Sequence, residues 1–341
     1  MLDIAVVIPT IREECAARWV QEWAADLADV RVILVEDNPE PSFRLPGDIE
    51  HYAWKHIDTE LGRDAWIIPR RTSACRSFGF LKALESRPDL IWTTDDDCYP
   101  EDARKGSFLE ELTSVFEVPV TSSDVMNGWW NTITSSGLYP RGYPYGIRGR
   151  ERPVMIHHGL WSNIPDLDGV TQLASPGFRL PPAELVDVVP EGAFFPFCIM
   201  NAAFRPEAAP LLYMLLQGQD VDGEPWGFDR FDDMWAGLFL KRVADHLGWA
   251  VMSGAPSVHH SRASDPHRNA QLEAEGIKAH EEFWPYIRDV YLTGTTASAC
   301  YQELAVAVAR YWGGSPRRGY WAKLGEAMQM WAAHCETAAG R

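Results

Sequence analysis

The stretch Leu90-Ile91-Trp92-Thr93-Thr94-Asp95-Asp96-Asp97 decides the fold, because an apolar run passes directly into three consecutive carboxylates. An apolar run of this kind is typical of a buried strand. Packed carboxylates repel one another, and a divalent cation that bridges them to a diphosphate is one reason to tolerate that repulsion. A solvated acidic turn or a helix cap is the alternative interpretation, since aspartate is favoured in both.

Two segments upstream have the same form. The apolar run at residues 4–8 ends in Pro9-Thr10, and the run at residues 30–35 ends in the turn-forming stretch Glu36-Asp37-Asn38-Pro39. We expect residues 73–82 to form a helix whose N-terminus points at a ligand cleft. Strands that alternate with helices predict a doubly wound α/β sheet, in which ligands collect at the carboxyl ends of the strands.

Charge and composition exclude several classes of protein. The 341-residue chain has a net charge of -17, the wrong sign for holding a nucleic acid or an anionic membrane. We find no apolar segment that could span a bilayer, no signal peptide and no CxxC pair among the six cysteines. No GxGxxG motif follows the first strand, so a flavin or nicotinamide site is not expected there. Together these features predict a cytoplasmic protein with reduced thiols and no flavin.

The chain divides into two regions by its pattern. Residues 1–268 are expected to form the ligand-binding catalytic domain, and residues 120–230 within it are rich in Gly, Pro and Trp, as is typical of long binding loops. Residues 269–341 are predicted to form amphipathic helices, notably at 302–312 and 320–334. Packing onto the rest of the chain or homo-oligomerisation through these helices would account for their apolar faces.

Eight short motifs follow one another in a particular order. They are Ile8-Pro9-Thr10-Ile11-Arg12, Ser73-Ala74-Cys75-Arg76, Asp95-Asp96-Asp97-Cys98, Arg141-Gly142-Tyr143-Pro144, Gly159-Leu160-Trp161, Asn163-Ile164-Pro165-Asp166, Phe231-Asp232-Asp233-Met234-Trp235-Ala236-Gly237 and His260-Ser261-Arg262-Ala263-Ser264. In this order the chain resembles the reversibly glycosylated polypeptides, the flavin-independent UDP-arabinopyranose mutases, over about residues 4 to 270. The resemblance implies a GT-A-like fold, a requirement for Mn²⁺ or Mg²⁺, and interconversion of pyranose and furanose forms of a nucleotide-linked sugar. It also implies an arginine that can become glycosylated.

The acidic triplet and a distant histidine are the candidate metal site. We expect Asp97 to be the main ligand, with His260 and Asp95 as further ligands, and a mixed nitrogen and oxygen set suits Mn²⁺ better than Mg²⁺. Asp95 and Asp96 are also candidates for contacts with metal-bound water and the ribose hydroxyls. Asp37 is placed to accept a hydrogen bond from the base, whether uracil or guanine. A structural histidine at 260 and a turn cap at 37 are the alternatives.

Two arginines and two aspartates are the candidate catalytic residues. Arg141 and Arg148 fall where the family has its glycosylated arginine and a second required arginine. A guanidinium is a poor nucleophile because its pKa lies above 12, so attack on C1 and a bidentate clamp on the diphosphate both stay open. Asp232 and Asp233 either cap the helix that follows them or, as the resemblance favours, contact the sugar hydroxyls or act as a general base.

Other polar and aromatic side chains complete the predicted site. Contacts with the substrate are expected from Thr10, Arg12, Ser73, Arg76, Trp161, Asn163 and Asn201. The sugar pocket is expected to be walled by Trp129, Trp130, Trp161 and Trp226. Large aromatic side chains more often serve packing, which is the alternative for all four tryptophans.

Departures from the plant pattern bear on the substrate. Arg71-Thr72 stands where the plant proteins carry Lys-Asp, and residues 219–228 form a longer segment than their counterpart. Both changes flank the base and the sugar, and the composition resembles that of a bacterial member of the family. We therefore favour a GDP-linked hexose such as GDP-L-galactose slightly over UDP-L-arabinose. A glycosyltransferase and a self-glycosylated carrier without activity are the alternatives to a mutase.

Overall fold

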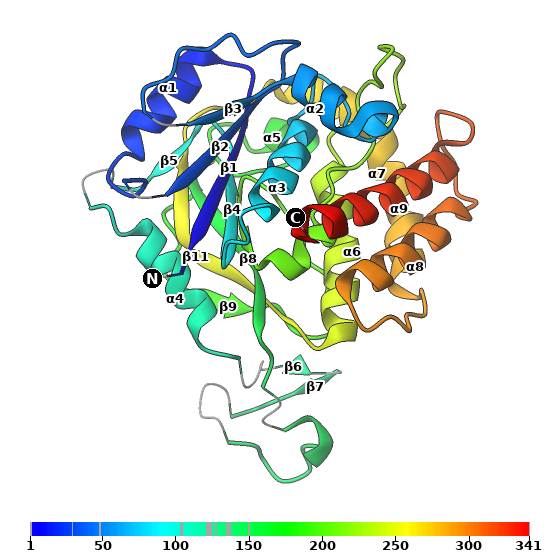
Figure 1. Cartoon of the computed structure of the whole chain (residues 1–341). Coiled ribbons are helices and arrows are strands. Elements are labelled where there is room, and N and C mark those ends of the chain that lie inside the picture. Colours follow the sequence, from blue (N-terminus) through cyan, green and yellow to red (C-terminus); the bar gives the residue numbers. More distant parts are fainter. Residues whose placement is uncertain are drawn as a thin grey trace.

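The computed structural model describes residues 2–28, 30–47, 49–102, 105–120, 125–126, 128–133, 138–148 and 151–340, and it shows one large sheet between helices (Figure 1). Within these residues nine strands form that sheet in the order β3-β2-β1-β4-β10-β8-β11-β5, and β9 pairs with β11. Its strands are β1 (Ile4–Thr10), β2 (Arg31–Glu36), β3 (Glu50–Tyr52), β4 (Leu90–Thr94), β5 (Cys98–Pro100), β8 (Val154–Asn163), β9 (Val186–Val188), β10 (Asn201–Phe204) and β11 (Ala250–His260). A separate hairpin consists of β6 (Val125–Met126) and β7 (Trp129–Trp130).

Helices cover both faces of the sheet. They are α1 (Glu13–Glu22), α2 (Trp54–Leu61), α3 (Arg76–Leu84), α4 (Phe108–Glu117), α5 (Gly169–Ala174), α6 (Asp232–Leu247), α7 (Pro266–Arg288), α8 (Ala297–Ala309) and α9 (Tyr320–Gly340). The apolar residues of α1 and α4 pack on one face, and those of α3, α6, α8 and α9 pack on the other. No helix among the described residues is long and apolar enough to cross a membrane.

Strand β1 is buried on both faces, which explains its continuous apolar sequence. Val6 and Ile8 face the core under α1 and α4, whereas Val7 faces the core under α3. On that second face α3 approaches the sheet at Gly79, where an added Cβ would lie 2.4 Å from a methyl group of Val7. A glycine is therefore required there for close packing of the helix on the strand.

The strand directions bring several polar segments to one edge. Strands β3, β2, β1 and β4 are parallel, β10 is antiparallel to both β4 and β8, and β8 is parallel to β11. Strands β1, β2, β4, β8 and β11 therefore all end at the same edge, which we call the carboxyl edge. This arrangement confirms the predicted α/β class and the helical C-terminal region.

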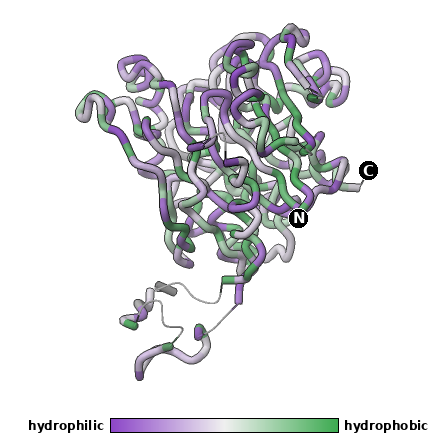
Figure 2. The backbone as a smooth tube through the Cα atoms, turned by 90° about the vertical axis from the view of Figure 1, so that its left-hand side faces the viewer, coloured by the Kyte–Doolittle hydropathy of each residue, from purple (hydrophilic) through white to green (hydrophobic). Residues whose placement is uncertain are grey.

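The described residues between 125 and 148 form an arm at the opposite edge. Its base is closed by backbone hydrogen bonds between Val120 and Arg152, with N···O distances of 3.0 and 2.9 Å. Strand β8 begins only two residues later, so the arm leaves the sheet where the parallel strands start. In two perpendicular views the arm projects away from the body of the protein (Figures 1 and 2).

The apolar faces of the C-terminal helices are covered by the chain itself. Trp331 of α9 is fully buried, stacks on Tyr213 with ring centroids 5.5 Å apart, and donates a hydrogen bond to the carbonyl of Pro210. Tyr301 of α8 is equally buried. These contacts favour intramolecular packing over oligomerisation as the role of α8 and α9. All six cysteines are free thiols.

Candidate active site

The three aspartates of the acidic triplet have different partners. Asp96 is buried and accepts hydrogen bonds from Thr10 Oγ1 at 2.6 Å and from the guanidinium of Arg12, which bonds both of its oxygens. Arg12 also reaches Asp97 Oδ2 at 3.1 Å. Because its two oxygens are already bonded, Asp96 ties the end of β1 to the end of β4, and the structure does not leave it free for the ribose as predicted.

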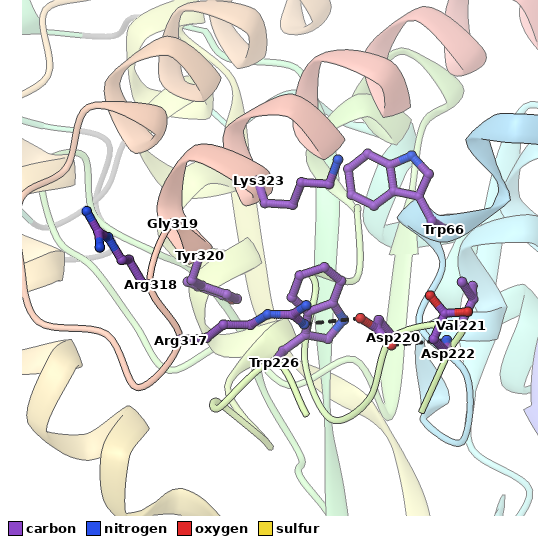
Figure 3. Close-up of a pocket in the computed structure, with 10 residues that line it drawn as sticks. All are labelled: Trp66, Asp220, Val221, Asp222, Trp226, Arg317, Arg318, Gly319, Tyr320 and Lys323. Atoms are coloured by element: carbon purple, nitrogen blue, oxygen red, sulfur yellow. Dashed lines mark hydrogen bonds and ion pairs between the residues drawn. The ribbon is translucent and has the colours of Figure 1, made fainter. Parts of the chain in front are cut away.

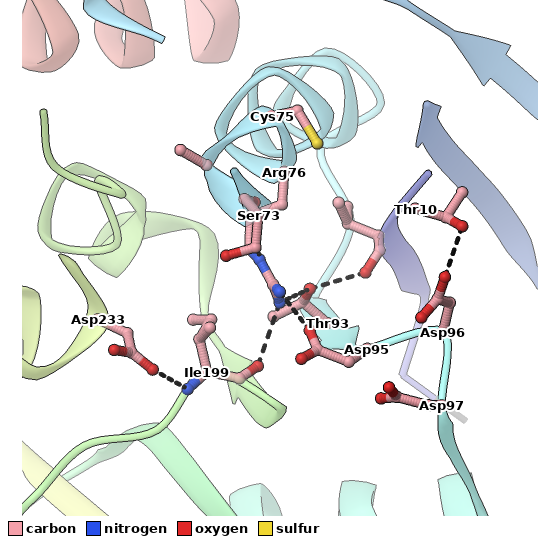
Figure 4. Close-up of polar contacts among 12 residues, drawn as sticks. Thr10, Ser73, Cys75, Arg76, Thr93, Asp95, Asp96, Asp97, Ile199 and Asp233 are labelled. Carbon is pink, nitrogen blue, oxygen red and sulfur yellow. Dashed lines mark hydrogen bonds and ion pairs between the residues drawn. The ribbon is translucent and has the colours of Figure 1, made fainter. Parts of the chain in front are cut away.

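Arg76 holds Asp95 from the first turn of α3. Its fully buried guanidinium forms an ion pair with Asp95 and donates to Thr93 Oγ1 at 3.2 Å and to the carbonyl of Ile199 at 3.3 Å (Figure 4). Ser73 starts the short helix before α3 and keeps an exposed side chain. Arg76 is therefore a positioning residue for Asp95, rather than a direct contact for the substrate.

Asp97 and His260 form a separate pair next to this network. Their closest atoms, Asp97 Oδ1 and His260 Nε2, are 3.9 Å apart, and each side chain is about 13% or less exposed. His260 Nδ1 lies 2.7 Å from the carbonyl of Ile164, which aims Nε2 at the carboxylate. Burial raises the pKa of Asp97, and the nearby Asp95 and Asp96 raise it further. A positive charge bound by Asp97 and His260 would offset the repulsion among these carboxylates.

The donor atoms of Asp97 and His260 fit a divalent cation whose remaining ligands come from the substrate and water. The described residues contain no cluster of three or more His, Cys, Asp or Glu side chains arranged to hold a metal by themselves. Mg²⁺ and similar hard cations are commonly held by one or two protein ligands together with phosphate oxygens and water. Asp97 and His260 can supply these two ligands, whereas Asp95 is engaged by Arg76.

A second group of carboxylates lies at the start of α6. Asp233 accepts hydrogen bonds from the backbone N–H groups of Ile199, at 3.2 Å, and Met234, at 2.9 Å. Burial raises the pKa of Asp232, and it raises the pKa of Asp233 well above the ordinary value, with the Asp232 charge adding to the effect. Ile199 bonds Arg76 through its carbonyl and Asp233 through its N–H, so one residue links the two carboxylate groups (Figure 4).

Asp166 and Arg230 lie near Asp233 in this second group, although neither was among the predicted site residues. Asp166 is exposed at the surface; partial loss of water raises its pKa, while the nearby Arg230 and His260 lower it. Arg230 adopts a left-handed backbone with φ 60° and donates to Glu273 Oε1 at 2.8 Å. Asp166 comes three residues after the end of β8, so the rule that selected Asp37 after β2 would have found it. No sequence pattern identifies Arg230 in this way, because its position depends on its contact with Glu273 of α7.

Asp37 lies at the carboxyl end of β2 beside a small cavity. Its Oδ1 accepts hydrogen bonds from Trp54 Nε1 at 2.6 Å and from the backbone N–H of Arg71 at 3.1 Å. A cavity of about 250 Å³ adjoins this point and is lined by Trp54, Asp58, Arg70, Arg71 and residues 219–223. Asp37 therefore fixes the turn, and contact with a base stays a prediction. Trp54 was not among the predicted site residues.

Two predicted substrate contacts form hydrogen bonds within the sheet, and contact of the half-buried Asn163 with the substrate stays a prediction. Asn201 is fully buried, and its amide bonds Trp92 Nε1 at 3.0 Å and the carbonyls of Leu160 and Pro256 at 3.1 and 3.0 Å. The prediction for Asn201 was wrong because it lies inside the sheet. Asn163 donates from its side chain to the carbonyl of His260 at 2.9 Å, which joins the ends of β8 and β11.

The predicted tryptophan wall does not form around one pocket. Trp161 is half-buried against the core near the end of β8. Trp226 instead lines a different cavity, of about 360 Å³, between residues 220–222 and the start of α9, where Arg317 lies over its ring (Figure 3). Trp129 belongs to the arm, and the side chain of Trp130 lies outside the described residues.

Arg141 and Arg148 lie in the arm and not in the cleft of their own chain. Arg148 donates to the carbonyl of Tyr143 at 3.0 Å and lies 3.7 Å from the centre of the Tyr145 ring, so it shapes the loop. Arg141 is exposed, and its guanidinium makes no hydrogen bond or ion pair with any described residue. In the described residues both arginines thus lie away from Asp97 and His260, and an arginine clamp on the diphosphate stays a prediction.

Comparisons with known proteins agree with the motif order. The family described as "Reversibly glycosylated polypeptide" matches residues 2–339. The chain is 35% identical to UDP-arabinopyranose mutase 1 of Arabidopsis thaliana, over 96% of this chain and 91% of that protein. It is 33% identical to UDP-arabinopyranose mutase 1 of Oryza sativa subsp. japonica, over 96% and 89%. A solved mycobacterial protein shares only 12% identity with the chain. The two superpose with a TM-score of 0.37 over 90% of this chain and 74% of that one. The chain belongs to the reversibly glycosylated polypeptide family.

Proposed function

We propose that this chain is a nucleotide-sugar mutase, an intramolecular transferase that interconverts the pyranose and furanose forms of a sugar on a nucleoside diphosphate. The observation that carries the proposal is the junction of two carboxylate groups at the carboxyl edge. Arg76, which holds Asp95, donates to the carbonyl of Ile199, and Asp233 accepts from the N–H of the same residue, so the two groups lie side by side. The names of the plant relatives support the same activity.

We assign the three parts of the substrate to three parts of the cleft. The base would lie toward Asp37, the diphosphate at Asp97 and His260, and the sugar at Asp166, Asp232 and Asp233. This order follows the edge of the sheet from β2 through β4 to α6. A divalent cation bound by Asp97 and His260 would supply positive charge against the departing diphosphate.

Exchange of the sugar ring needs two proton transfers. When the C1–O5 bond breaks, O5 must gain a proton, and when O4 attacks C1, the O4 hydroxyl must lose one. Asp233 can hold a proton because its pKa is raised well above the ordinary value, and it would donate that proton to O5. Asp232, whose pKa is raised less, would accept the proton from O4 as a carboxylate. The pair then holds the same number of protons as before.

For the preferred substrate we propose a GDP-linked hexose of the L-galactose type rather than UDP-L-arabinose. Two departures from the plant pattern meet beside Asp37, where Arg71 Nη1 lies 3.4 Å from Gln219 Oε1 and the Arg71 N–H bonds the carboxylate. A changed base site and the longer segment at 219–228 support a substrate that differs from that of the plant relatives.

The test is to incubate the pure protein with a panel of UDP- and GDP-sugars in Mn²⁺ and to separate pyranose from furanose products. We expect isomerisation without any added acceptor, fastest for a GDP-hexose. Net transfer of sugar to an added acceptor would show a glycosyltransferase instead. One round of self-glycosylation without turnover, detected by intact mass, would show a carrier. Faster turnover of UDP-arabinopyranose would keep the mutase but overturn the substrate preference.

A further inference from the structure

The charges of the cleft do not suit an anionic substrate. Its described carboxylates outnumber its arginines, and three of these arginines are already bonded to a carboxylate, Arg12 to Asp96 and Asp97, Arg76 to Asp95, and Arg230 to Glu273, whereas Arg262, two residues after His260, is exposed. A nucleoside diphosphate would bring further negative charge. A divalent cation at Asp97 and His260 and the exposed Arg262 would offset part of that charge, and a further cation would strengthen binding.

The arm offers the complementary charge. The sequence from 121 to 150 contains three arginines and one aspartate, in a chain whose net charge is -17. Arg141 is exposed and has no partner among the described residues, and the arginine fork suits bidentate binding of a phosphate.

The arm also exposes large apolar side chains that its own chain does not cover. Tyr145 is 83% exposed, Leu138 is 65% exposed and Trp129 is 50% exposed. Exposed aromatic residues beside an arginine are typical of the centre of a protein interface. Arg148 holds this loop in shape through Tyr143 and Tyr145, so the arm presents a formed surface.

The arm cannot serve the cleft of its own chain in the geometry observed. Its base is closed at Val120 and Arg152, before β8, whereas the cleft lies beyond the other end of β8 at Asn163. Ten strand residues span about 30 Å. The arm points away from the body along that direction (Figures 1 and 2).

We propose that the arm of one copy completes the carboxylate cleft of a second copy and places Arg141 against the diphosphate there. Reciprocal exchange of arms between two copies forms a closed, symmetric dimer, in which each apolar arm surface is covered and each cleft gains a cation. The role of Arg141 in turnover rests on the proposed function, whereas the contact between arm and cleft does not.

A complementation test decides whether Arg141 acts within or between chains. Two differently tagged chains are co-expressed and the mixed dimers are purified through both tags. Dimers of Arg141→Ala with Asp97→Ala should show about half of the wild-type activity, because one intact cleft meets one intact arm. Dimers of wild type with the double variant should be inactive, because neither cleft is complete. The reverse pattern, activity only in the second mixture, would overturn the proposal, as would a fully active monomer in sedimentation.

A second measurement does not depend on any mutase activity. The photo-cross-linker p-benzoyl-phenylalanine is placed at position 145 in the full chain, and the irradiated protein is run on a denaturing gel. We expect a product of twice the 38.4 kDa chain mass, with mass spectrometry locating the link in a peptide that carries Asp166 or Asp233. Links confined to the monomer band, or links to surfaces outside the cleft, would overturn the contact. An inactive wild type with the expected link would refute only the proposed function.

Discussion

The cleft and the arm differ in the sign of their charges and in how those charges are held. In the cleft, most carboxylates are at least half-buried, and Arg12, Arg76 and Arg230 are each bonded to one, so these charges are fixed in place before a substrate arrives. In the arm, Arg148 is held by a carbonyl and an aromatic ring, and Arg141 is left exposed. The difference teaches that the carboxylates proposed for metal binding and proton transfer are held in place at the carboxyl edge, whereas the charge of Arg141 is left exposed in the arm.

The largest effect is expected from the metal pair. Replacing Asp97 by Ala should reduce kcat/KM about 1,000-fold or more, because a cation that neutralises a leaving diphosphate contributes several kcal/mol. Excess chelator should abolish activity in the wild type, and Mn²⁺ should restore it. Mn²⁺ binding, followed by electron paramagnetic resonance, should be lost in the variant. The exposed Asp187 of β9 provides the matched control, Asp187→Ala. Undiminished activity in excess chelator would remove the metal from the scheme.

The next effect concerns the arm. Arg141→Ala should lower kcat/KM about 100-fold, close to the value of one charge-assisted contact in a site shielded from water. Arg141→Lys should recover part of this loss if Arg141 only clamps the diphosphate, because a cation remains while the bidentate geometry is lost. A loss as large in the Lys variant, with nucleotide binding preserved in calorimetry, would indicate a nucleophile. The exposed Arg179 gives the control Arg179→Ala.

A smaller effect is expected when Asp233 is replaced, and it is a gain in the stability of the fold rather than a loss. The raised pKa of Asp233 means that its charged form is disfavoured in the folded protein, so stability is lost as the pH rises through that pKa. Asp233→Asn removes the charge and keeps one acceptor for the Ile199 N–H. The free energy of unfolding of the variant should therefore exceed that of the wild type by about 1 kcal/mol at pH 8. The gain should be smaller at pH 5, and activity should fall. Thermal unfolding at the two pH values measures this, and a lower melting temperature at pH 8 would contradict it.

The smallest global effect is expected for Arg148→Ala. The change removes the bonds to Tyr143 and the contact with Tyr145, which lie in the arm and away from the core. The free energy of unfolding of the body should change by less than about 0.5 kcal/mol, as for other surface positions. Limited proteolysis within the arm should become several-fold faster. Equal proteolysis of wild type and variant would show that Arg148 does not shape the arm.

Much of the cleft could be predicted from the sequence, since it depends on local rules. An apolar run followed by Asp95-Asp96-Asp97 indicates a buried strand and a polar strand end, and the same rule places Thr10 and Asp37 at the neighbouring strand ends. The rule fails for Asn201, which starts the antiparallel strand β10, because no local pattern shows that its amide is used by Trp92 and two carbonyls. The prediction for Trp226 fails for a related reason, because tertiary packing places its loop against the start of α9.

The sequence by itself determined the strand ends, the order of the motifs and the negative charge of the chain, because these depend on neighbouring residues and on composition. Only the tertiary structure decided how the carboxylates are divided. It bonded Asp96 to Arg12, held Asp95 with Arg76 and left Asp97 facing His260, across a separation of more than 160 residues. It also sent Arg141 to the opposite edge of the sheet, because the direction of β8 fixes the side from which the arm leaves. Strand direction is a property of the whole sheet, so no motif around Arg141 could reveal it.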